Sequence, residues 1–289
     1  VTNNAARPPG VVARHLKELG VDADPGDVVT SAQAAAHEVA RRVPAKSRVL
    51  VVGGEGLYEA LRDEGLEPVD SAAADPSAVV QGFHPGIGWA ALAEGAYALR
   101  RGIPWVASNL DLTIPTSGGI APGNGTLVNA VAAAAGRRPD VVAGKPFRPL
   151  FDETVRRISS RRPLVVGDRL DTDIEGAVTC GADSLLVMTG VTDVHIMCHA
   201  PSNQRPDYVA WTMTGLFAQH ACPEMDGDAT WTMGGWVVAV DAGTLVVRHR
   251  GADADDGLRT VAAAAWHALD EDGDRQLDTS GLDPLWSPR

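Results

Sequence analysis

The sequence is short of several residue types, and each shortage excludes a class of protein. Three cysteines, Cys180, Cys198 and Cys222, make no disulfide framework in 289 residues and suit a reducing cytoplasm. No apolar run is long enough to cross a bilayer, and no signal peptide is visible. There is no basic run, and the net charge of -12 argues against nucleic acid or an anionic membrane as a partner. We therefore expect a cytoplasmic protein whose acidic balance would favour a bound cation.

The sequence is rich in short apolar runs that alternate with helical stretches. Hydrophobic residues make up 45% of the chain, enough for the cores of two or three domains. Strands expected at 48–52, 78–83 and 104–107 are separated by helical segments, which is the rhythm of an α/β fold with parallel strands. The turn Gly53-Gly54-Glu55-Gly56 follows the first strand, but its spacing does not match a dinucleotide-binding motif.

The most informative stretch spans residues 162–177. Its apolar run, 164–166, predicts a parallel strand buried on both faces. Asp168, Asp171 and Asp173 follow at the edge where open α/β sheets bind ligands. Because carboxylate oxygens suit a hard cation, Asp168 predicts a metal site, with Asp173 placed to hold the waters around the ion. A solvated acidic turn is the alternative.

Two further segments carry groups suited to a phosphate. Lys145 stands between Gly144 and Pro146, which fix the backbone on either side of a single ammonium group. A fixed ammonium can offset the charge of a phosphoryl group. The polar segment Thr2-Asn3-Asn4 precedes a helix expected over 9–19 and offers hydroxyl, amide and backbone N–H groups to an oxyanion. Ordinary helix capping is the more common meaning of such a segment.

Other features leave alternatives open. Residues 108–125 form a long loop rich in Gly, Pro, Thr and Asn, and loops of this length tend to be functional. His84 and Trp89 could contact a substrate, although a histidine at a strand end is more often merely hydrogen-bonded. A group of His and Cys side chains could pass for a zinc site, but its spacing matches no common one. Its members are His195, Cys198, His199, His220 and Cys222.

Three of these segments together resemble a known family. Residues 2–4, 144–146 and 167–174, in this order, resemble motifs II, III and IV of the haloacid dehalogenase superfamily. With a large insertion between the first two, the chain resembles the NagD and 4-nitrophenylphosphatase-like subclass. Its tail resembles the extension of actinobacterial glycerol-3-phosphate phosphatases.

The resemblance implies a domain organisation. Residues 1–27 and 137–225 would form a Rossmann-like core, and residues 28–136 an inserted α/β cap of the C2 type. Residues 230–289 would form a small α+β appendage similar to acetyltransferases. We find no glycine-rich loop for the pyrophosphate of acetyl-CoA in this tail, so a packing or oligomer role, such as a homodimer contact, fits it better than a second activity.

The resemblance also implies a Mg²⁺-dependent phosphatase that acts on a small phosphorylated metabolite. The segment Thr2-Asn3-Asn4 and Lys145 would bind the phosphoryl group, Asp168 would bind Mg²⁺, and Asp173 would support the waters of the metal. Ile114 stands where the vitamin B6 phosphatases carry His. An apolar residue there favours glycerol 3-phosphate, with phosphoglycolate or another small ester as the alternative.

The family's motif I does not precede Thr2. This motif is an Asp-x-Asp pair whose first carboxylate attacks phosphorus. We therefore expect N-terminal sequence to be missing, so that a strand ending at Val1 and the strand 164–166 face a gap, and the chain alone to be inactive and poorly stable. Two other hypotheses remain. One is a natural homologue without a nucleophile that binds a phosphorylated metabolite, and the other is an unrelated receiver-like or nucleotide-binding α/β module.

Overall fold

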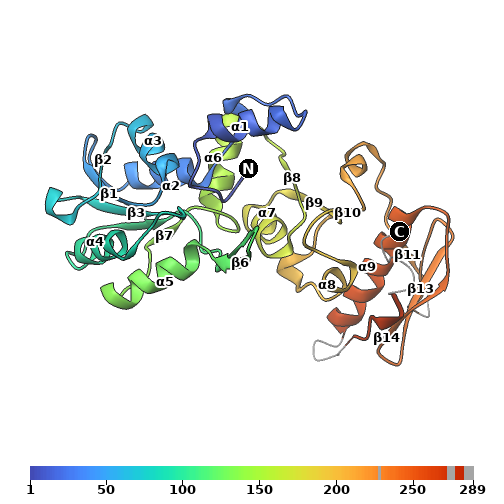
Figure 1. Ribbon diagram of the computed structural model, residues 1–289. Coiled ribbons are helices and arrows are strands. Elements are labelled where there is room, and N and C mark those ends of the chain that lie inside the picture. Colours follow the sequence, from blue (N-terminus) through green and yellow to red (C-terminus); the bar gives the residue numbers. More distant parts are fainter. Residues whose placement is uncertain (227–228, 272–276, 283–289) are drawn as a thin grey trace. The chain divides into compact units, whose positions relative to one another are not determined.

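The computed structural model describes residues 1–226, 229–271 and 277–282 (Figure 1). The chain divides into two compact units, Val1–Arg161 and Arg162–Arg289, and each is described here by itself. These boundaries differ from those of the expected core, cap and appendage, so that division stays a prediction. Residues 272–276 and 283–289 of the expected appendage lie outside the described part. None of the described helices is long and apolar enough to span a bilayer.

The first unit is built on a five-stranded parallel sheet of order β2-β1-β3-β4-β7. Its strands are β1 (Arg48–Val52), β2 (Glu67–Val69), β3 (Ala78–Gln81), β4 (Trp105–Ala107) and β7 (Val141–Val142). Helices cover both faces of the sheet, as Figure 1 shows. The helices of this unit are α1 (Pro9–Glu18), α2 (Ser31–Ala40), α3 (Glu55–Asp63), α4 (Trp89–Leu99), α5 (Asn124–Ala135) and α6 (Arg148–Ile158). The expected α/β fold class is confirmed.

Alternate residues of the strands enter two different cores. In β1, Val49 and Val51 pack with α2, α3 and α6, whereas Leu50 and Val52 pack with α4 and α5. Successive side chains of a strand point to opposite faces, so a strand covered on both sides needs a continuous apolar run. The run at 48–52 therefore predicts this strand at its observed bounds.

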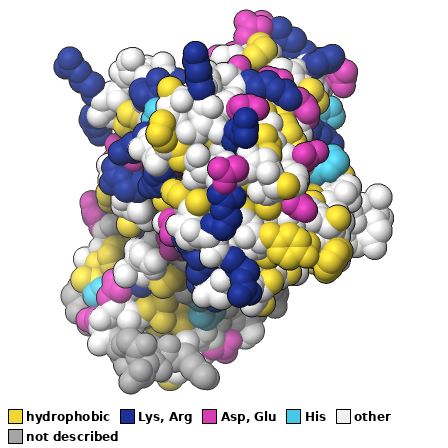
Figure 2. Space-filling view, turned by 90° about the vertical axis from the view of Figure 1, so that its left-hand side faces the viewer, with side chains coloured by type: hydrophobic (Ala, Val, Ile, Leu, Met, Phe, Trp, Pro, Cys, Tyr) yellow, Lys and Arg dark blue, Asp and Glu magenta, His cyan; other side chains and the backbone are white. Residues whose placement is uncertain are grey.

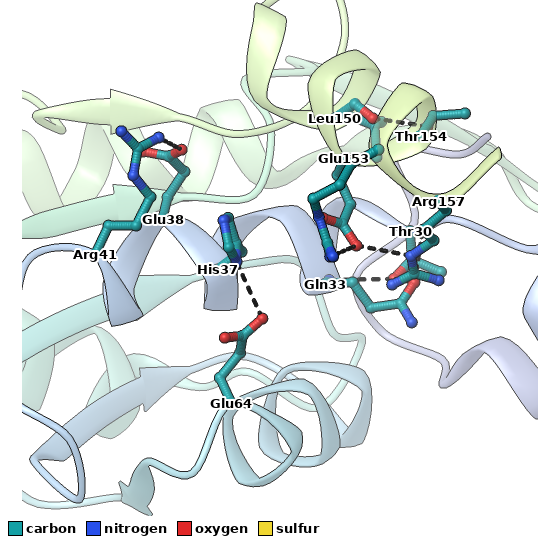
Figure 3. Close-up of polar contacts among 11 residues, drawn as sticks. Thr30, Gln33, His37, Glu38, Arg41, Glu64, Leu150, Glu153, Thr154 and Arg157 are labelled. Atoms are coloured by element: carbon teal, nitrogen blue, oxygen red, sulfur yellow. Dashed lines mark hydrogen bonds and ion pairs between the residues drawn. The ribbon is translucent and has the colours of Figure 1, made fainter. Parts of the chain in front are cut away.

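Helix α2 begins with a capping box and meets α6 across the first of these cores. The Thr30 hydroxyl accepts the Gln33 N–H at 3.3 Å, and the Gln33 side chain accepts the Thr30 N–H at 3.0 Å. Figure 3 shows this cap near Glu153 and Arg157 of α6, which bond to each other at 2.7 Å. The carboxylate of Glu153 also accepts from Arg156, and the residue is only 5% exposed. A buried charge is tolerated here because two guanidinium groups pair with it.

The surface of the first unit mixes charges of both signs. Figure 2 shows Lys and Arg side chains spread among Asp, Glu and hydrophobic ones on one face of the molecule. Exposed pairs of the first unit include Arg62 with Glu55 at 2.9 Å and Arg48 with Glu67 at 3.6 Å. Such solvent-exposed pairs contribute little to stability.

The second unit contains a parallel and an antiparallel sheet. The parallel sheet has the order β10-β9-β8, and the antiparallel sheet the order β11-β12-β13-β14. Its strands are β8 (Leu164–Gly167), β9 (Asp183–Val187), β10 (Tyr208–Ala210), β11 (Glu224–Met225), β12 (Trp231–Met233), β13 (Trp236–Asp241) and β14 (Thr244–His249). Its helices are the π-helical turn η3 (Leu170–Ile174), α7 (Glu175–Cys180), α8 (Val194–Cys198) and α9 (Ala254–Glu271).

One core joins the two sheets of the second unit. Leu258 and Val261 of α9 pack in the same cluster as Val238 of the antiparallel sheet and Leu186 and Val209 of the parallel sheet. Helix α9 therefore closes both sheets, and the tail has the packing role that its sequence suggests.

Two local expectations were wrong. Residues 108–125 are not all loop, because 113–116 and 119–122 pair as the antiparallel hairpin β5–β6. Thr2 makes an isolated parallel bridge with Thr30, and the expected strand ending at Val1 stays a prediction. Strand β8 is not buried on both faces, since Leu164 is 42% exposed. In the described structure β8 lies at the edge of its sheet and pairs only with β9, so less of its surface is covered.

Candidate active site

The first group of candidate residues forms around Lys145. The Asn3 side chain binds the backbone of Lys145 twice: its Oδ1 accepts the Lys145 N–H at 2.7 Å, and its Nδ2 donates to the Lys145 carbonyl at 3.1 Å. The neighbouring Gly144 is needed for this approach, because a Cβ there would lie 2.5 Å from Asn3 Oδ1. The amide of Asn3 therefore ties the N-terminal segment to a residue 142 positions away.

The N-terminal segment itself is held by turns and by a strand-like bridge. The Thr2 N–H donates to Val29 at 2.9 Å, and its carbonyl accepts from Ser31 at 2.9 Å. The Thr2 hydroxyl accepts the Asn4 N–H at 3.2 Å, and Asn4 Oδ1 accepts the Ala6 N–H at 2.9 Å. Each short polar side chain thus bonds to the backbone two residues further on, which fixes a tight polar loop.

The glycine-rich turn after β1 packs against this loop. A Cβ at Gly56 would lie 2.6 Å from the carbonyl oxygen of Ala5, and the Gly56 N–H donates to Ala6 at 3.3 Å. These glycines permit a close backbone approach. The motif that superficially suggests a dinucleotide site therefore has a packing role here.

Sequence reasoning missed Asp111. Asn3 Nδ2 donates to both of its carboxylate oxygens, at 3.3 and 3.2 Å. Asp111 begins the segment that leads into the β5–β6 hairpin, which carries Ile114. The composition of this loop predicts a functional segment, but no spacing in the sequence singles out one carboxylate 108 residues away from its partner.

Three other side chains were also expected near a substrate. Ile114 is half-buried on β5 opposite Ala121. His84 is exposed, and its Nδ1 accepts the Gly86 N–H at 3.1 Å, which is the ordinary hydrogen-bonded role of a histidine at a strand end. Trp89 is 78% exposed at the start of α4.

The second group of candidate residues surrounds Asp168, directly after β8. Its Oδ2 accepts the Val191 N–H at 2.8 Å, and its carbonyl accepts the Thr192 N–H at 3.1 Å. Gly190 lies so close that a Cβ there would be 1.9 Å from Asp168 Oδ2. The loop after β9 therefore fixes one carboxylate oxygen, and no described residue donates to the other.

The two neighbouring carboxylates differ in environment. Asp173 is 5% exposed, and its Oδ2 accepts the Arg169 N–H at 3.1 Å. Asp171 points its carboxylate at the Arg169 guanidinium, with contacts of 2.9 and 2.6 Å. An arginine thus offsets the charge of Asp171, which reduces the repulsion expected among three close carboxylates.

Asp168 provides an oxygen ligand suited to Mg²⁺, but it does not form a complete metal site by itself. Oxygen donors of the Asp168 type are those that Mg²⁺ prefers, and Mg²⁺ keeps several waters, so few protein ligands are needed. Within the described residues no group of three or more His, Cys, Asp or Glu side chains is arranged to hold a metal ion. The His and Cys side chains considered for a zinc site therefore form no such group among the described residues. His199, one of its members, bonds both ring nitrogens to carbonyl oxygens, of His195 at 2.7 Å and of Leu277 at 2.9 Å.

Comparisons with known proteins identify the family of the chain. Residues 1–67 match the family model described as haloacid dehalogenase-like hydrolase, and residues 142–216 match one described as HAD-hydrolase-like. The D-glycerol 3-phosphate phosphatase of Mycobacterium tuberculosis is 45% identical over 276 residues, covering 93% of this chain and 76% of that protein. The chain belongs to the haloacid dehalogenase-like hydrolases. The match of 1–67 gives no support to the expected loss of N-terminal sequence, which stays a prediction.

Other relatives of this haloacid dehalogenase-like hydrolase are also named phosphatases. The acid sugar phosphatase of Staphylococcus haemolyticus is 33% identical over 72% of this chain and 78% of its own. Among solved structures, the glycerol phosphate phosphatase of M. tuberculosis in complex with magnesium has a TM-score of 0.81 at 44% identity, covering 92% of this chain and 79% of that one. The p-nitrophenyl phosphatase of Archaeoglobus fulgidus has a TM-score of 0.68 at 31% identity, covering 74% and 82%.

The tail of the hydrolase matches a model described as GCN5-related N-acetyltransferase like domain, over residues 233–282. Acetyl-CoA, the cofactor of acetyltransferases, does not fit the start of α9. Asp253 Oδ1 accepts the N–H groups of Asp255 at 2.8 Å and Asp256 at 3.3 Å. The helix N-terminus that would receive a pyrophosphate is therefore occupied by one carboxylate and flanked by two more.

Proposed function

We propose that this hydrolase is a Mg²⁺-dependent phosphatase of a small phosphate monoester, with glycerol 3-phosphate as the leading substrate. The observation that carries the proposal is the pair of hydrogen bonds by which Asn3 holds Lys145 beside the Thr2 loop. These bonds hold together two segments 142 positions apart, one with the Thr2 hydroxyl and the other with Lys145, whose side chain ends in an ammonium group. These are the groups that bind and neutralise a phosphoryl group.

The two groups of residues divide the chemistry. Lys145 would offset the negative charge of the transferring group, and Thr2 would orient it. Asp168 would hold the metal, and Asp173 would bond its waters. When bound, Mg²⁺ would neutralise further charge on the phosphoryl oxygens. We propose that the first group of residues binds the phosphoryl group and that the second binds the metal ion.

No residue of this sequence is assigned as the nucleophile. The Asp-x-Asp pairs that lie wholly within the described residues have carboxylates engaged elsewhere. Asp22 and Asp24 face Lys17, Asp171 and Asp173 bond to Arg169, and Asp253 caps the helix that contains Asp255. We propose that transfer through an aspartyl-phosphate needs an Asp-x-Asp pair ahead of Thr2.

Substrate choice is assigned to the β5–β6 hairpin. Ile114 offers no hydrogen bond to a pyridoxal ring, which favours a small polyol phosphate. The 45% identical relative is named as a D-glycerol 3-phosphate phosphatase, which supports the same substrate. Phosphoglycolate or another small ester is the alternative.

Phosphate release tests the proposal. Glycerol 3-phosphate is incubated with the 289-residue chain and with the same chain carrying an Asp-x-Asp strand ahead of Val1. Only the extended chain should release phosphate, and EDTA should stop it. In that background Lys145→Met and Asp168→Asn should each lower kcat/KM on the order of a hundredfold or more, because each removes charge stabilisation of the transition state. Equal turnover by both chains would refute the nucleophile assignment, and no turnover of any small ester by the extended chain would refute the phosphatase.

A second candidate is a homologue without catalysis that binds a phosphorylated metabolite. It is favoured by one observation, that Asn3 holds Lys145 beside the Thr2 loop while the described Asp-x-Asp carboxylates are engaged elsewhere. Binding of glycerol 3-phosphate without release of phosphate from the extended chain would identify it.

A further inference from the structure

The side-chain amide of Asn3 has no hydrogen left for a phosphate. One Nδ2 hydrogen points to the Lys145 carbonyl at 3.1 Å, and the other to the carboxylate of Asp111 at 3.2 Å. Its Oδ1 accepts the Lys145 N–H at 2.7 Å. An amide carries two donors and one acceptor oxygen, so these contacts use both donors.

Asp111 contributes to the orientation of this amide. If the Asn3 amide were turned by 180°, its NH₂ group would face the Lys145 N–H and its oxygen would face the Asp111 carboxylate. Both contacts would be repulsive. The carboxylate therefore reinforces the orientation that the Lys145 backbone favours, in which Asn3 holds both the N–H and the carbonyl of Lys145.

The backbone of Asp111 is itself fixed. Its N–H donates to Asn109 Oδ1 at 3.1 Å, and its carbonyl accepts the Gly125 N–H at 2.9 Å. Asn109 is 4% exposed and donates to the Asn3 carbonyl at 2.8 Å. Gly123 packs so closely that a Cβ there would lie 2.2 Å from the Asp111 carbonyl oxygen. The carboxylate is thus held by the same loop that carries the β5–β6 hairpin.

We propose that Asp111 is a positioning residue of the active site, which sets Lys145 through Asn3. In this account Asn3 is a clamp and not a ligand of the phosphoryl group, and the substrate-selecting hairpin is linked to the phosphate-binding lysine. The inference rests on the proposed function only in naming a phosphate as the group that Lys145 meets.

The first measurement needs no ligand. Hydrogen exchange of the Lys145 amide, read by NMR on the 289-residue chain, reports the bond to Asn3 Oδ1. Asp111→Ala should speed this exchange on the order of tenfold, the effect of losing one hydrogen bond to a charged group. Asp111→Asn keeps an acceptor oxygen and should stay within about threefold of the parent chain. Thr116→Ala, which removes a bond in the same hairpin, is the matched control and should change nothing at Lys145.

The second measurement uses inorganic phosphate as the probe. The sequence has only three lysines, so acetylation of Lys145 can be compared with that of Lys17 and Lys46 in the same sample. Phosphate should protect Lys145 alone, and the concentration for half protection should rise on the order of tenfold in Asp111→Ala but little in Asp111→Asn. Circular dichroism checks folding, and Asp111→Ser replaces Asp111→Ala if the latter does not fold.

Each result decides something. Unchanged exchange at Lys145 in Asp111→Ala would overturn the positioning role. Equal losses in Asp111→Asn and Asp111→Ala would also overturn it, because the effect would then come from charge and not from the hydrogen bond to Asn3. The Lys145 amide could exchange faster in Asp111→Ala as expected while phosphate fails to protect the Lys145 side chain from acetylation in the parent chain. That result would support the clamp and count against the proposed function.

Discussion

Single residues decide the geometry around the proposed metal ligand. A Cβ at Gly190 would lie 1.9 Å from Asp168 Oδ2, so Gly190→Ala must displace either the carboxylate or the loop that bonds to it. We expect this variant to bind Mg²⁺ on the order of tenfold more weakly, the usual cost of disturbing groups that orient a metal ligand. Isothermal titration with Mg²⁺ measures it. Gly26→Ala, which meets nothing within 4 Å, is the control, and equal affinities of both variants would argue against Asp168 as the ligand.

The cysteines provide a second prediction at this scale. Burial, with a smaller contribution from Asp193, raises the pKa of the Cys198 thiol to about 12, whereas Cys222 is exposed. Only the thiolate reacts with alkylating agents. Iodoacetamide at pH 8 should therefore label Cys222 and leave Cys198 unmodified in the folded protein, as peptide mass mapping would show. Fast labelling of Cys198 would mean that its surroundings open readily.

The residues that sequence reasoning finds are those with local signals. Asp168 directly follows an apolar strand and Lys145 lies between Gly and Pro, so both can be predicted. Asp111 has no such signal, because its role depends on Asn3, 108 positions away. The same limit applies to Asn3: its polar character predicts a ligand of the phosphate, but the contacts that occupy its amide belong to the tertiary structure.

Elements covered on both sides are the most predictable. Strand β1 matches its apolar run because both faces are buried, whereas β8 is half-exposed at a sheet edge. An apolar run does not reveal how many neighbours a strand has. The β5–β6 hairpin escapes prediction because Pro115, Gly119 and Pro122 are typical of loops, although proline is tolerated where a strand has a partner on one side only.

Within α6, Glu153 pairs with Arg156 and Arg157, and these ion pairs predict how the stability of the protein depends on pH. Burial would raise the pKa of Glu153, but hydrogen bonds from Arg156 and Arg157 and their charges outweigh it and hold the pKa below its usual 4.5. A lowered carboxyl pKa contributes stability that is present above the unfolded value and lost as the pH falls through the folded value.

Glu153→Gln should therefore destabilise the protein at neutral pH. We expect a loss of about 1–3 kcal/mol at pH 7, because the two arginines lose a charged acceptor. The difference from the parent chain should shrink as the pH falls below about 4. Urea denaturation at pH 7 and pH 3.5 measures both values. Asp152→Asn, which removes an exposed partner of Arg148, should have little effect. A difference independent of pH would show that packing and not charge is responsible.

At the scale of the whole molecule, each unit carries a different part of the proposed chemistry, one cationic and one anionic. Lys145 and the Thr2 loop are ordered within the first unit, and Asp168 and Asp173 within the second. Neither part is sufficient alone. A bound phosphate needs cations to offset its charge, and a metal ion at Asp168 needs further oxygen ligands. The tail completes the core of the second unit through α9.

The most direct test of the proposed phosphatase is the coupling between its two ligands. If phosphate changes the affinity for Mg²⁺, Mg²⁺ must change the affinity for phosphate by the same factor. Titration of Mg²⁺ with and without inorganic phosphate should show Mg²⁺ binding on the order of tenfold tighter with phosphate, and Lys145→Met should abolish this gain. An affinity for Mg²⁺ that is the same with and without phosphate would contradict the proposed Mg²⁺-dependent phosphatase.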